Sequence, residues 1–353
     1  MPDFDFLLQN TPLYPLRFAP VYKNYIWGGT LFGDLFQREL PDNNENYAES
    51  WEIADHSHGH SIIKNGILRG IPLNEVVRQV PKALFGSGFP PKHLKGHQPS
   101  RFPLILKYLD AQSPLSVQIH PDNKLAEELQ LENSGKTEFW VVVAAKPDAS
   151  LWIGTNQEYP KQEVENAIRS GNVQPLLLRQ NVQKDDCFYL PPGTLHSLGE
   201  GILVAEIQTS SDTTFRVFDW NRTDKDGKMR ELKIEEAILA LPEKSTPVKA
   251  NASVKTISSN CEELIADKHF TVRRWKFDEK LHWNSDDRCH IWTVLEGSVV
   301  LRYDYGNTSA EEKLCFGDSV LIPAITPQLD WIPADSALEF GKSAVLLEAA
   351  PEI

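Results

Sequence analysis

Two polar side chains near the middle of the chain are spaced so that they could share a metal ion. Gln118 and His120 lie two residues apart in the segment SVQIHPD at 116–122. Because side chains alternate across a strand, residues two apart point to the same face. Gln118 offers a carbonyl oxygen and His120 an imidazole nitrogen, although an isolated strand histidine usually has only a structural role. The pair is therefore the start of a metal-site hypothesis.

Two further candidate ligands stand where other apolar runs begin or end. Glu138 begins a long apolar run, and His196 follows the turn PPGT at 191–194. The four residues would supply two nitrogens and two oxygens. That set suits zinc in a site open to water or substrate, and iron or manganese would also accept it. Inward-facing residues of several strands meet at one centre in a small barrel, so the hypothesis requires such a fold.

The elements that must position these residues are mainly strands. Runs rich in valine, isoleucine and aromatic residues, with turn residues between them, favour strands at 102–110, 115–120, 138–145, 201–208, 290–305 and 318–324. Apolar residues at helical spacing predict helices within 71–86, 123–132, 160–171 and 230–240. We therefore expect a mainly β protein with helical insertions in its N-terminal part.

A weak internal repeat predicts two barrels in one chain. TEFWVVVAAKPD at 137–148 resembles RCHIWTVLEGSV at 288–299, and DDCFYLPPGTLH at 185–196 resembles GDSVLIPAITPQ at 317–328. Each pair is a strand ending at a tight turn followed by a strand ending at a proline turn. This arrangement is typical of a cupin, whose antiparallel strands form a double-sheet jelly roll.

The repeat also predicts the domains. Residues 242–259 are polar and rich in Lys, Ser, Thr and Pro, so we expect a linker there. It would divide a catalytic cupin domain with helical insertions at 1–241 from a cupin-like domain at 260–353. The second copy has His290 where the first has Glu138, and Gln328 where the first has His196. We therefore expect the second domain to lack metal ligands.

Composition limits the partners. The chain has 353 residues and a net charge of -13, a sign that repels nucleic acid, so a phosphorylated substrate would need a local basic pocket. The absence of an export signal and of an apolar run near the roughly 20 residues of a membrane span predicts a cytoplasmic protein. Four cysteines without a Cys-x-x-Cys pair predict free thiols. No feature indicates the oligomeric state.

The motifs, taken in order, resemble the type I mannose-6-phosphate isomerase family of the cupin superfamily. The resemblance covers most of the chain, and its most specific elements are Gln-x-His-Pro, Lys-x-Glu and Pro-Gly-x-x-His. The length is similar to that of the short bacterial form, which implies no larger helical insertion. The resemblance is carried by KNYIWGGTLF at 23–32, AESWEIADH at 48–56, FPLILKYLDAQSPLSVQIHPDNKLA at 102–126, GKTEFWVVVAAKPDASLWIG at 135–154 and FYLPPGTLHSLGEGILVAEIQTSSDTTFRVFDWNR at 188–222.

The resemblance implies roles for individual residues. It implies one zinc ion per chain and an active-site arginine in SDTTFRVFD, which is Arg216. It also places Lys136 at the pocket as a catalytic candidate, and Lys107 and Ser116 as phosphate contacts. Trp27 and Glu52 lie in the N-terminal signature and are expected near the pocket. The implied zinc ligands are Gln118, His120, Glu138 and His196.

The implied reaction interconverts mannose 6-phosphate and fructose 6-phosphate by moving a proton between C1 and C2 through a cis-enediol. Zinc and Arg216 would stabilise negative charge on the carbonyl oxygen. The base is open: a metal-bound hydroxide or Lys136 could serve, and Lys136 could instead only position substrate oxygens.

Structural alternatives stay open for these residues. Arg216 could instead pair with Asp212 or Asp219, Lys107 could be a surface lysine, and Ser116 an ordinary strand serine. The DHSHGH run at 55–60 is expected to be a solvated loop. The alternative functions are an isomerase of a related sugar or sugar phosphate, a non-isomerase metal cupin such as an iron dioxygenase, and a sugar-binding bicupin.

Overall fold

The computed structural model describes residues 12–88, 101–223, 226–305, 308–334 and 343–352. Residues 1–11, on which the expectation of no export signal partly depends, lie outside this part of the chain. Contacts divide the chain into two units. The central unit comprises Tyr22–Ser50 and Lys107–Ala252, and the terminal unit comprises Met1–Val21, Trp51–Leu106 and Ser253–Ile353. No helix in the described ranges is long and apolar enough to cross a membrane.

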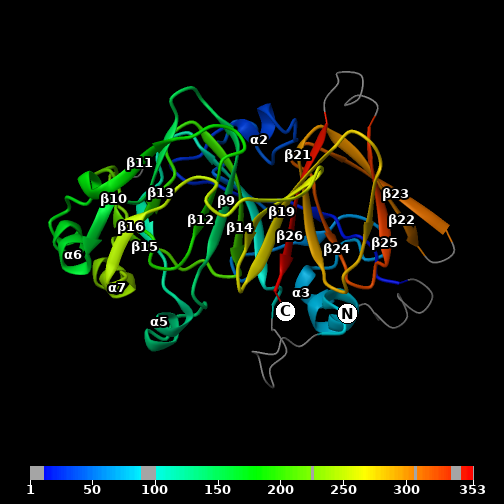
Figure 1. Ribbon diagram of the computed structural model, residues 1–353, viewed down its shortest axis with the longest axis horizontal. Coiled ribbons are helices and arrows are strands. Elements are labelled where there is room, and N and C mark those ends of the chain that lie inside the picture. The colour runs from blue at the N-terminus through cyan, green and yellow to red at the C-terminus, as the bar shows by residue number, and fades with distance from the viewer. Residues whose placement is uncertain (1–11, 89–100, 224–225, 306–307, 335–342, 353) are drawn as a thin grey trace. The chain divides into compact units, whose positions relative to one another are not determined.

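The central unit contains most of the residues of two six-stranded sheets (Figure 1). The first has the order β11-β10-β13-β8-β15, with β16 paired to β10, and the second has the order β12-β9-β14-β7-β3-β2. The first sheet consists of β8 (Val117–Ile119), β10 (Ser150–Pro160), β11 (Leu177–Asn181), β13 (His196–Ser197), β15 (Phe215–Phe218) and β16 (Lys244–Pro247). The second consists of β2 (Val21–Lys23), β3 (Glu49–Ile53), β7 (Leu104–Ala111), β9 (Glu138–Ala145), β12 (Cys187–Leu190) and β14 (Ile202–Thr209).

Helices cover one face of the first sheet. α6 (Lys161–Arg169) and α7 (Ile234–Ala240) lie side by side in Figure 1 and contact β10 and β15 respectively. Their buried side chains form one core cluster with Val117, Ile119, Phe215 and Val217. Because strand residues alternate, the intervening Gln118 and Arg216 point to the opposite face. The remaining helices of this unit are α2 (Leu31–Asp34), α5 (Asn123–Glu128) and the 3-10 turn η1 (Gln174–Leu176).

The terminal unit has a similar pair of sheets, with orders β17-β18-β19-β26-β21-β24 and β20-β25-β22-β23. The first comprises β17 (Lys255–Ser258), β18 (Cys261–Ala266), β19 (Phe270–Phe277), β21 (His290–Glu296), β24 (Ser319–Ile322) and β26 (Ala344–Pro351). The second comprises β20 (Leu281–Asn284), β22 (Ser298–Tyr305), β23 (Thr308–Cys315) and β25 (Gln328–Pro333). Two small sheets pair β1 (Phe18–Ala19) with β6 (Ile62–Ile63) and β4 (Asp55–His56) with β5 (Gly59–His60), and α3 (Leu73–Gln79) and α4 (Pro81–Phe85) complete the unit.

The repeated segments occupy matching places in the two units. In the central unit β9 lies between β12 and β14, and in the terminal unit β21 lies between β24 and β26. Glu138, the first residue of β9, faces the last residue of β12, and His290, the first residue of β21, faces the last residue of β24. The two segments that resemble each other in sequence therefore form equivalent antiparallel pairs.

The expected mainly β character is confirmed, and each predicted strand or helix range contains an observed element of that type. One local prediction was wrong in part. The 55–60 segment, expected to be a solvated loop, is a β4–β5 hairpin in which Ser57, His58 and His60 are exposed but Asp55 and His56 are buried. Asp55 accepts a hydrogen bond from the Phe102 backbone N–H at 2.7 Å. The segment 242–259 contains two paired strands, β16 and β17, and its role as a linker remains a prediction. The predicted domain boundaries remain a prediction.

Candidate functional site

Strand β8 places one candidate ligand at the middle of the site. β8 lies between β13 and β15, and Gln118 is the residue that faces both His196 on β13 and Arg216 on β15. Gln118 and Arg216 also line a common cavity. The short strand thus brings an amide, an imidazole and a guanidinium to one face, opposite the face covered by α6 and α7.

Three of the four predicted ligands form a tight buried cluster. His120 and His196 come from the first sheet region and Glu138 from β9 of the second, and all three side chains are about 1% exposed. His120 Nε2 lies 3.1 Å from Glu138 Oε1, and His196 Nε2 lies 3.5 Å from Glu138 Oε2. Gln118 Nε2 lies 3.1 Å from His196 Nε2, so the fourth residue adjoins the cluster. Rotation of the amide would present the Gln118 oxygen instead.

Backbone carbonyls fix the tautomer of both histidines. His120 Nδ1 donates to the Thr213 carbonyl at 2.9 Å, and His196 Nδ1 donates to the Thr194 carbonyl at 2.9 Å. A proton on Nδ1 of a neutral imidazole leaves Nε2 as a bare acceptor. Both Nε2 atoms are directed toward the Glu138 carboxylate. Orientation by a second hydrogen bond is the usual arrangement of metal-binding histidines.

The three clustered side chains together carry a net negative charge. Burial lowers the pKa of His120 and lowers that of His196 to about 3, so both rings are neutral. Burial opposes ionisation of Glu138, but nearby Lys136 and His120 outweigh it and hold the pKa of the carboxyl well below its usual range. In the described structure, His120 Nε2 and Glu138 Oε2 are buried without a hydrogen-bond partner. Two imidazole lone pairs and a carboxylate in one buried place fit a divalent cation.

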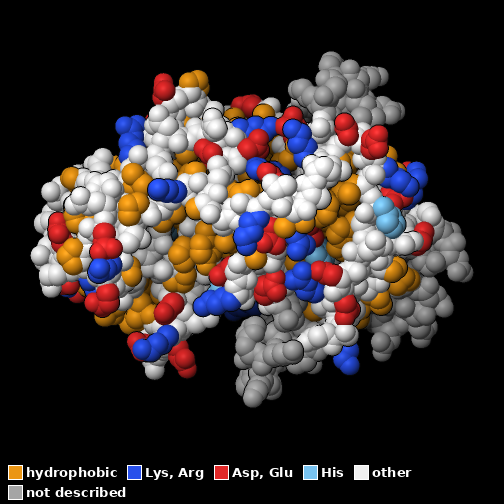
Figure 2. Space-filling view, in the orientation of Figure 1, with side chains coloured by type: hydrophobic (Ala, Val, Ile, Leu, Met, Phe, Trp, Pro, Cys, Tyr) orange, Lys and Arg blue, Asp and Glu red, His pale blue; other side chains and the backbone are white. Residues whose placement is uncertain are grey.

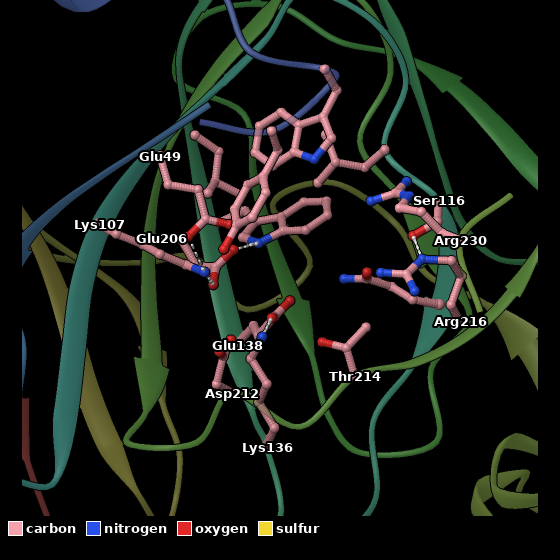
Figure 3. Close-up of a pocket in the computed structure, with 16 residues that line it drawn as sticks. Glu49, Lys107, Ser116, Lys136, Glu138, Glu206, Asp212, Thr214, Arg216 and Arg230 are labelled. Carbon is pink, nitrogen blue, oxygen red and sulfur yellow. Dashed lines mark hydrogen bonds and ion pairs between the residues drawn. The ribbon is translucent and has the colours of Figure 1, made fainter. Parts of the chain in front are cut away.

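The cluster borders a cavity of about 300 Å³ in the central unit, which Figure 3 shows in close-up. Its walls combine aromatic and aliphatic side chains with groups of both charge signs. A mostly polar cavity of this size suits a small hydrophilic molecule. The lining residues are Tyr25, Trp27, Glu49, Lys107, Leu109, Leu115, Ser116, Gln118, Lys136, Glu138, Trp140, Glu206, Asp212, Thr214, Arg216 and Arg230.

One side of the cavity holds a lysine between carboxylates. Lys107 Nζ lies 3.3 Å from Glu49 Oε2 and 3.4 Å from Glu206 Oε1, and Trp140 donates its indole N–H to Glu206 Oε2 at 2.7 Å. Burial disfavours the Lys107 ammonium, but Glu206 and Glu49 outweigh it and raise its pKa. Burial, reinforced by the Glu138 charge, raises the pKa of Glu206 to about 7. Glu206 can therefore exchange a proton near neutral pH.

The opposite side of the cavity is cationic. Figure 3 shows Ser116, Arg216 and Arg230 together there, away from Lys107, Glu49 and Glu206. Arg216 donates from Nε to Ser116 Oγ at 3.1 Å and from Nη1 to the Glu231 carbonyl at 3.0 Å. Within the described ranges, no carboxylate lies within salt-bridge distance of Arg216, so its pairing with Asp212 or Asp219 is not observed.

The other predicted residues divide into two groups. Lys136 lies at the cluster, with Nζ 2.6 Å from Glu138 Oε1, and Trp27 lines the cavity. Glu52 is buried on β3 but is not a lining residue. Because Glu52 is three residues from the lining residue Glu49 on one strand, the two side chains point to opposite faces.

Sequence reasoning missed several lining residues, including Glu49, Glu206 and Arg230. For Glu206 a signal was present, because a carboxylate inside the apolar run GILVAEIQ is rarely buried without a function or a partner. Arg230 lies in a polar, irregular segment, where a charged residue is ordinary and gives no signal of a functional site.

Comparison with known proteins agrees with the resemblance seen in the motifs. The model of the type I phosphomannose isomerase catalytic domain matches residues 15–139. Mannose-6-phosphate isomerase ManA of Bacillus subtilis is 35% identical over 284 residues, which cover 80% of this chain and 86% of that protein. Mannose-6-phosphate isomerase of Streptococcus mutans is 38% identical over 287 residues, which cover 80% of this chain and 85% of that protein.

A solved structure extends the similarity to the whole chain. The crystal structure of mannose 6-phosphate isomerase from Bacillus subtilis superposes with a TM-score of 0.80 at 30% identity and covers 96% of this chain and 99% of that one. Identity of this level over most of both chains places the relationship beyond the fold alone. The chain belongs to the type I phosphomannose isomerase family.

Proposed function

We propose that this protein is a metal-dependent aldose-ketose isomerase that interconverts mannose 6-phosphate and fructose 6-phosphate, with zinc as the metal. The observation that carries the proposal is the buried His120–Glu138–His196 acceptor cluster, which borders a cavity with a cationic side. The curated relatives are mannose-6-phosphate isomerases, which supports the same substrate.

Gln118, His120, Glu138 and His196 would hold the metal. The donor set of two imidazole nitrogens, a carboxylate and an amide oxygen suits zinc. When bound, the ion would supply positive charge that polarises the sugar carbonyl. The cluster's unpartnered His120 Nε2 and Glu138 Oε2 atoms support this assignment, because buried polar atoms ordinarily have a partner.

The chain's own residues would handle charge and protons. In the direction from mannose 6-phosphate, a base removes the proton from C2 and the carbonyl oxygen at C1 gains a proton, which gives the cis-enediol. The enediol is then protonated at C1 while its C2 hydroxyl loses a proton, which leaves the carbonyl of fructose 6-phosphate at C2. Arg216 would place a fixed positive charge beside the oxygens where negative charge develops. Glu206 is our candidate base, because it lines the cavity and its pKa is raised to about 7.

Lys136 would have a supporting role. Its ammonium lies 2.6 Å from Glu138 Oε1, so it neutralises part of the ligand's charge and can donate to a substrate oxygen. Trp27 and Trp140 would form an apolar wall that limits water at the reacting carbons.

For the fold, we propose that the two sheets of each unit form a cupin barrel. The support is the repeated β12-β9-β14 and β24-β21-β26 arrangement. The metal cluster belongs to the first repeat. The equivalent position of Glu138 in the second repeat is His290, which lies 2.7 Å from Glu348 and 2.8 Å from Asp286.

A coupled assay tests the proposed function. Purified protein loaded with zinc should convert mannose 6-phosphate to fructose 6-phosphate. Coupling enzymes then convert fructose 6-phosphate to glucose 6-phosphate and oxidise it, and the accompanying reduction of a nicotinamide cofactor is measured. Chelation should abolish turnover, and added zinc should restore it. Loaded protein with no turnover of this substrate would disprove the assignment. Parallel assays with other hexose phosphates and with free mannose distinguish a related sugar isomerase.

A further inference from the structure

Asp110 is a buried carboxylate next to the turn that forms one wall of the cavity. It is the last residue but one of β7, and only 1% of its surface is exposed. Carboxylates are rarely buried to this extent without a partner. On the face of the molecule shown in Figure 2, acidic and basic side chains are interspersed at the surface, which is the ordinary place for charged groups. The burial of Asp110 therefore requires a specific reason.

The partner of Asp110 is the backbone at the start of α2. Its Oδ2 atom accepts a hydrogen bond from the Leu31 N–H at 2.7 Å. Burial raises the pKa of Asp110 to about 6, and the Leu31 N–H and the charge of Lys146 limit the rise, so the carboxyl is mostly ionised at neutral pH. A hydrogen bond to an ionised acceptor in a buried place is among the stronger kinds. Asp110 thus fastens the first residue of α2 to β7.

Gly29 allows this carboxylate to approach the turn. A Cβ atom at Gly29 would lie 2.5 Å from Asp110 Oδ2 and 2.7 Å from Oδ1, which is closer than Cβ contacts occur. The neighbouring Gly28 is constrained in the same way, because a Cβ atom there would lie 2.6 Å from the backbone nitrogen of Ala48. A larger residue at either position would push the turn away from its support.

Backbone hydrogen bonds hold the same turn on both sides of Trp27. The Trp27 carbonyl accepts from the Gln112 N–H at 2.8 Å, two residues after Asp110 in the chain. Gly29 and Tyr47 exchange two backbone hydrogen bonds of 3.2 and 3.0 Å. The end of β7 therefore supports the turn twice, once through a backbone amide and once through the Asp110 side chain.

The turn presents two aromatic rings to the cavity. Tyr25 and Trp27 both line it, and their rings stack with centroids 5.8 Å apart. Trp27 is only 4% exposed and packs in one core cluster with Leu109 and Trp140, which also line the cavity. The position of this apolar wall therefore depends on the position of the turn.

We propose that Asp110 is a positioning residue for the isomerase, which holds the Tyr25–Trp27 wall in place through its hydrogen bond to Leu31 and its close contact with Gly29. The inference rests on the proposed function. Asp110 is not a lining residue of the cavity, so it acts only through the turn. The wall limits water at the reacting carbons and confines the sugar, and a displacement of about 1 Å near reacting groups can cost about 100-fold in rate.

Two substitutions of Asp110 separate positioning from general stability. Asp110→Ala removes the acceptor, and kcat for mannose 6-phosphate, calculated per bound zinc ion, should fall about 10- to 100-fold. KM should change less than about threefold, because the charged groups of the cavity remain. Asp110→Asn keeps an oxygen that can accept the Leu31 N–H, so its kcat should stay within about threefold of wild type. A merely structural carboxylate would lower the yield of folded protein and leave kcat per zinc ion unchanged.

Asp34 provides a matched control. Its Oδ2 atom accepts a hydrogen bond from Thr30 Oγ at 2.7 Å, so this carboxylate also bonds to the start of α2, but it is exposed. Asp34→Ala removes the same chemical group from the same segment and leaves the contact with β7 in place. It should change kcat and KM by less than about twofold.

Gly29→Ala tests the contact from the other side. The added methyl group would collide with the Asp110 carboxylate, so kcat should fall by a factor similar to that in Asp110→Ala. In the double variant Gly29→Ala/Asp110→Ala, the carboxylate that the methyl group meets is gone. Its kcat should therefore equal that of Asp110→Ala alone. A loss equal to the product of the two single losses would show that the two residues act independently and would contradict the inference.

Hydrogen exchange followed by mass spectrometry measures the turn itself without relying on activity. Peptides that cover residues 24–36 should exchange at least about 10-fold faster in Asp110→Ala than in wild type, since the variant loses a charged hydrogen bond. The same peptides should exchange at the wild-type rate in Asp34→Ala. Peptides from the terminal unit should not change in either variant.

The outcomes separate this inference from the proposed function. If wild-type protein shows no isomerase activity, the proposed function fails, and hydrogen exchange still decides whether Asp110 holds the turn. Unchanged exchange of residues 24–36 in Asp110→Ala would overturn the inference, and so would faster exchange with an unchanged kcat per zinc ion. If Asp110→Ala does not fold, Gly29→Ala against Asp110→Asn gives the same comparison, with a loss of kcat expected only in the first.

Discussion

Gln118 faces His196 across one pairing of β8 and lies 3.1 Å from its Nε2 atom. Across the other pairing, the same residue faces Arg216. The three-residue strand β8 therefore ties the candidate metal cluster to the cationic side of the cavity. One short strand therefore fixes the position of Arg216 relative to the candidate metal ligands.

Removal of one imidazole should remove the metal. His196→Ala leaves the Glu138 carboxylate, His120 and Gln118, and a site with one ligand fewer should lose zinc affinity by at least about 100-fold. Zinc per chain, measured by elemental analysis after dialysis, should fall from one ion in wild type to a trace. His282→Ala is a suitable control, because that histidine is half-exposed and paired with Asp330. Full zinc content in His196→Ala would show that the cluster is not the metal site.

Arg216→Ala should separate catalysis from metal binding. No metal-ligating role is proposed for this side chain, so zinc content should remain at the wild-type level. The loss of a fixed positive charge beside the developing oxyanion should lower kcat by about 100- to 1,000-fold. Arg216→Lys should recover only part of the rate, since an ammonium cannot reproduce the contacts of Nε with Ser116 and Nη1 with Glu231 together. Turnover near that of wild type in the alanine variant would indicate a structural arginine.

Local signals in the sequence were enough to predict the strands that hold the candidate site. Periodicity and β-branched residues identified the strands around Gln118 and Glu138, because each of those strands alternates or is buried on both faces. The internal repeat identified β9 and β21 as equivalent strands, which the sheet orders bear out. The 55–60 hairpin was missed because the burial of Asp55 and His56 depends on contacts distant in sequence, such as the Phe102 backbone.

Site residues that belong to a sequence motif could be predicted, whereas residues that only the fold brings to the cavity could not. Gln118, His120, Glu138 and His196 fall in recognisable motifs, and the structure brings them together. Arg230 reaches the cavity only because a hairpin and Asp219 place it there. The positions of Lys107 and Ser116 on opposite sides of the cavity could not be predicted from the sequence either, since they depend on which sheet each strand joins.

Lys107 and Glu206 should behave as a coupled pair. Lys107→Met leaves the buried Glu206 and Glu49 carboxylates without a cation between them, and breaking a buried pair from one side typically costs about 3–5 kcal/mol of unfolding free energy. The double variant Lys107→Met/Glu206→Gln should be less destabilised than the sum of the two single variants, which urea unfolding would measure as a coupling energy.

The same double variant tests the predicted phosphate contact of Lys107. If Lys107 only balances charge, the affinity for inorganic phosphate, measured as its stabilisation of the protein in a thermal-shift titration, should stay close to the wild-type value even though turnover is lost with Glu206. A large loss of phosphate binding, confirmed in Lys107→Met alone, would instead support the sequence-based assignment of Lys107 to the phosphate. Strict additivity of the two stability changes would contradict the pairing.

His290 should make the stability of the terminal unit depend on pH. Both ring nitrogens face carboxylates, with Nδ1 2.7 Å from Glu348 Oε1 and Nε2 2.8 Å from Asp286 Oδ1, an arrangement that requires the imidazolium. Burial disfavours that charge, but the hydrogen bonds to Asp286 and Glu348 outweigh it and raise the pKa of His290. Burial resists ionisation of Asp286, but hydrogen bonds from His290 and Arg288 outweigh it and lower its pKa.

The signs of these shifts define the pH window. A raised His290 pKa stabilises the folded state fully below about pH 6.5, the usual histidine value, and this contribution is lost as pH rises through the folded-state pKa. A lowered Asp286 pKa stabilises above its usual value of about 3.9 and is lost in stronger acid. In urea unfolding from pH 5 to 9, wild type should lose more stability on the alkaline side than His290→Gln, whose curve should be flatter. His282→Gln, which removes an exposed histidine paired with Asp330 at 2.8 Å, should retain the wild-type profile. Parallel pH profiles for wild type and His290→Gln would show that the buried imidazolium contributes nothing to folding.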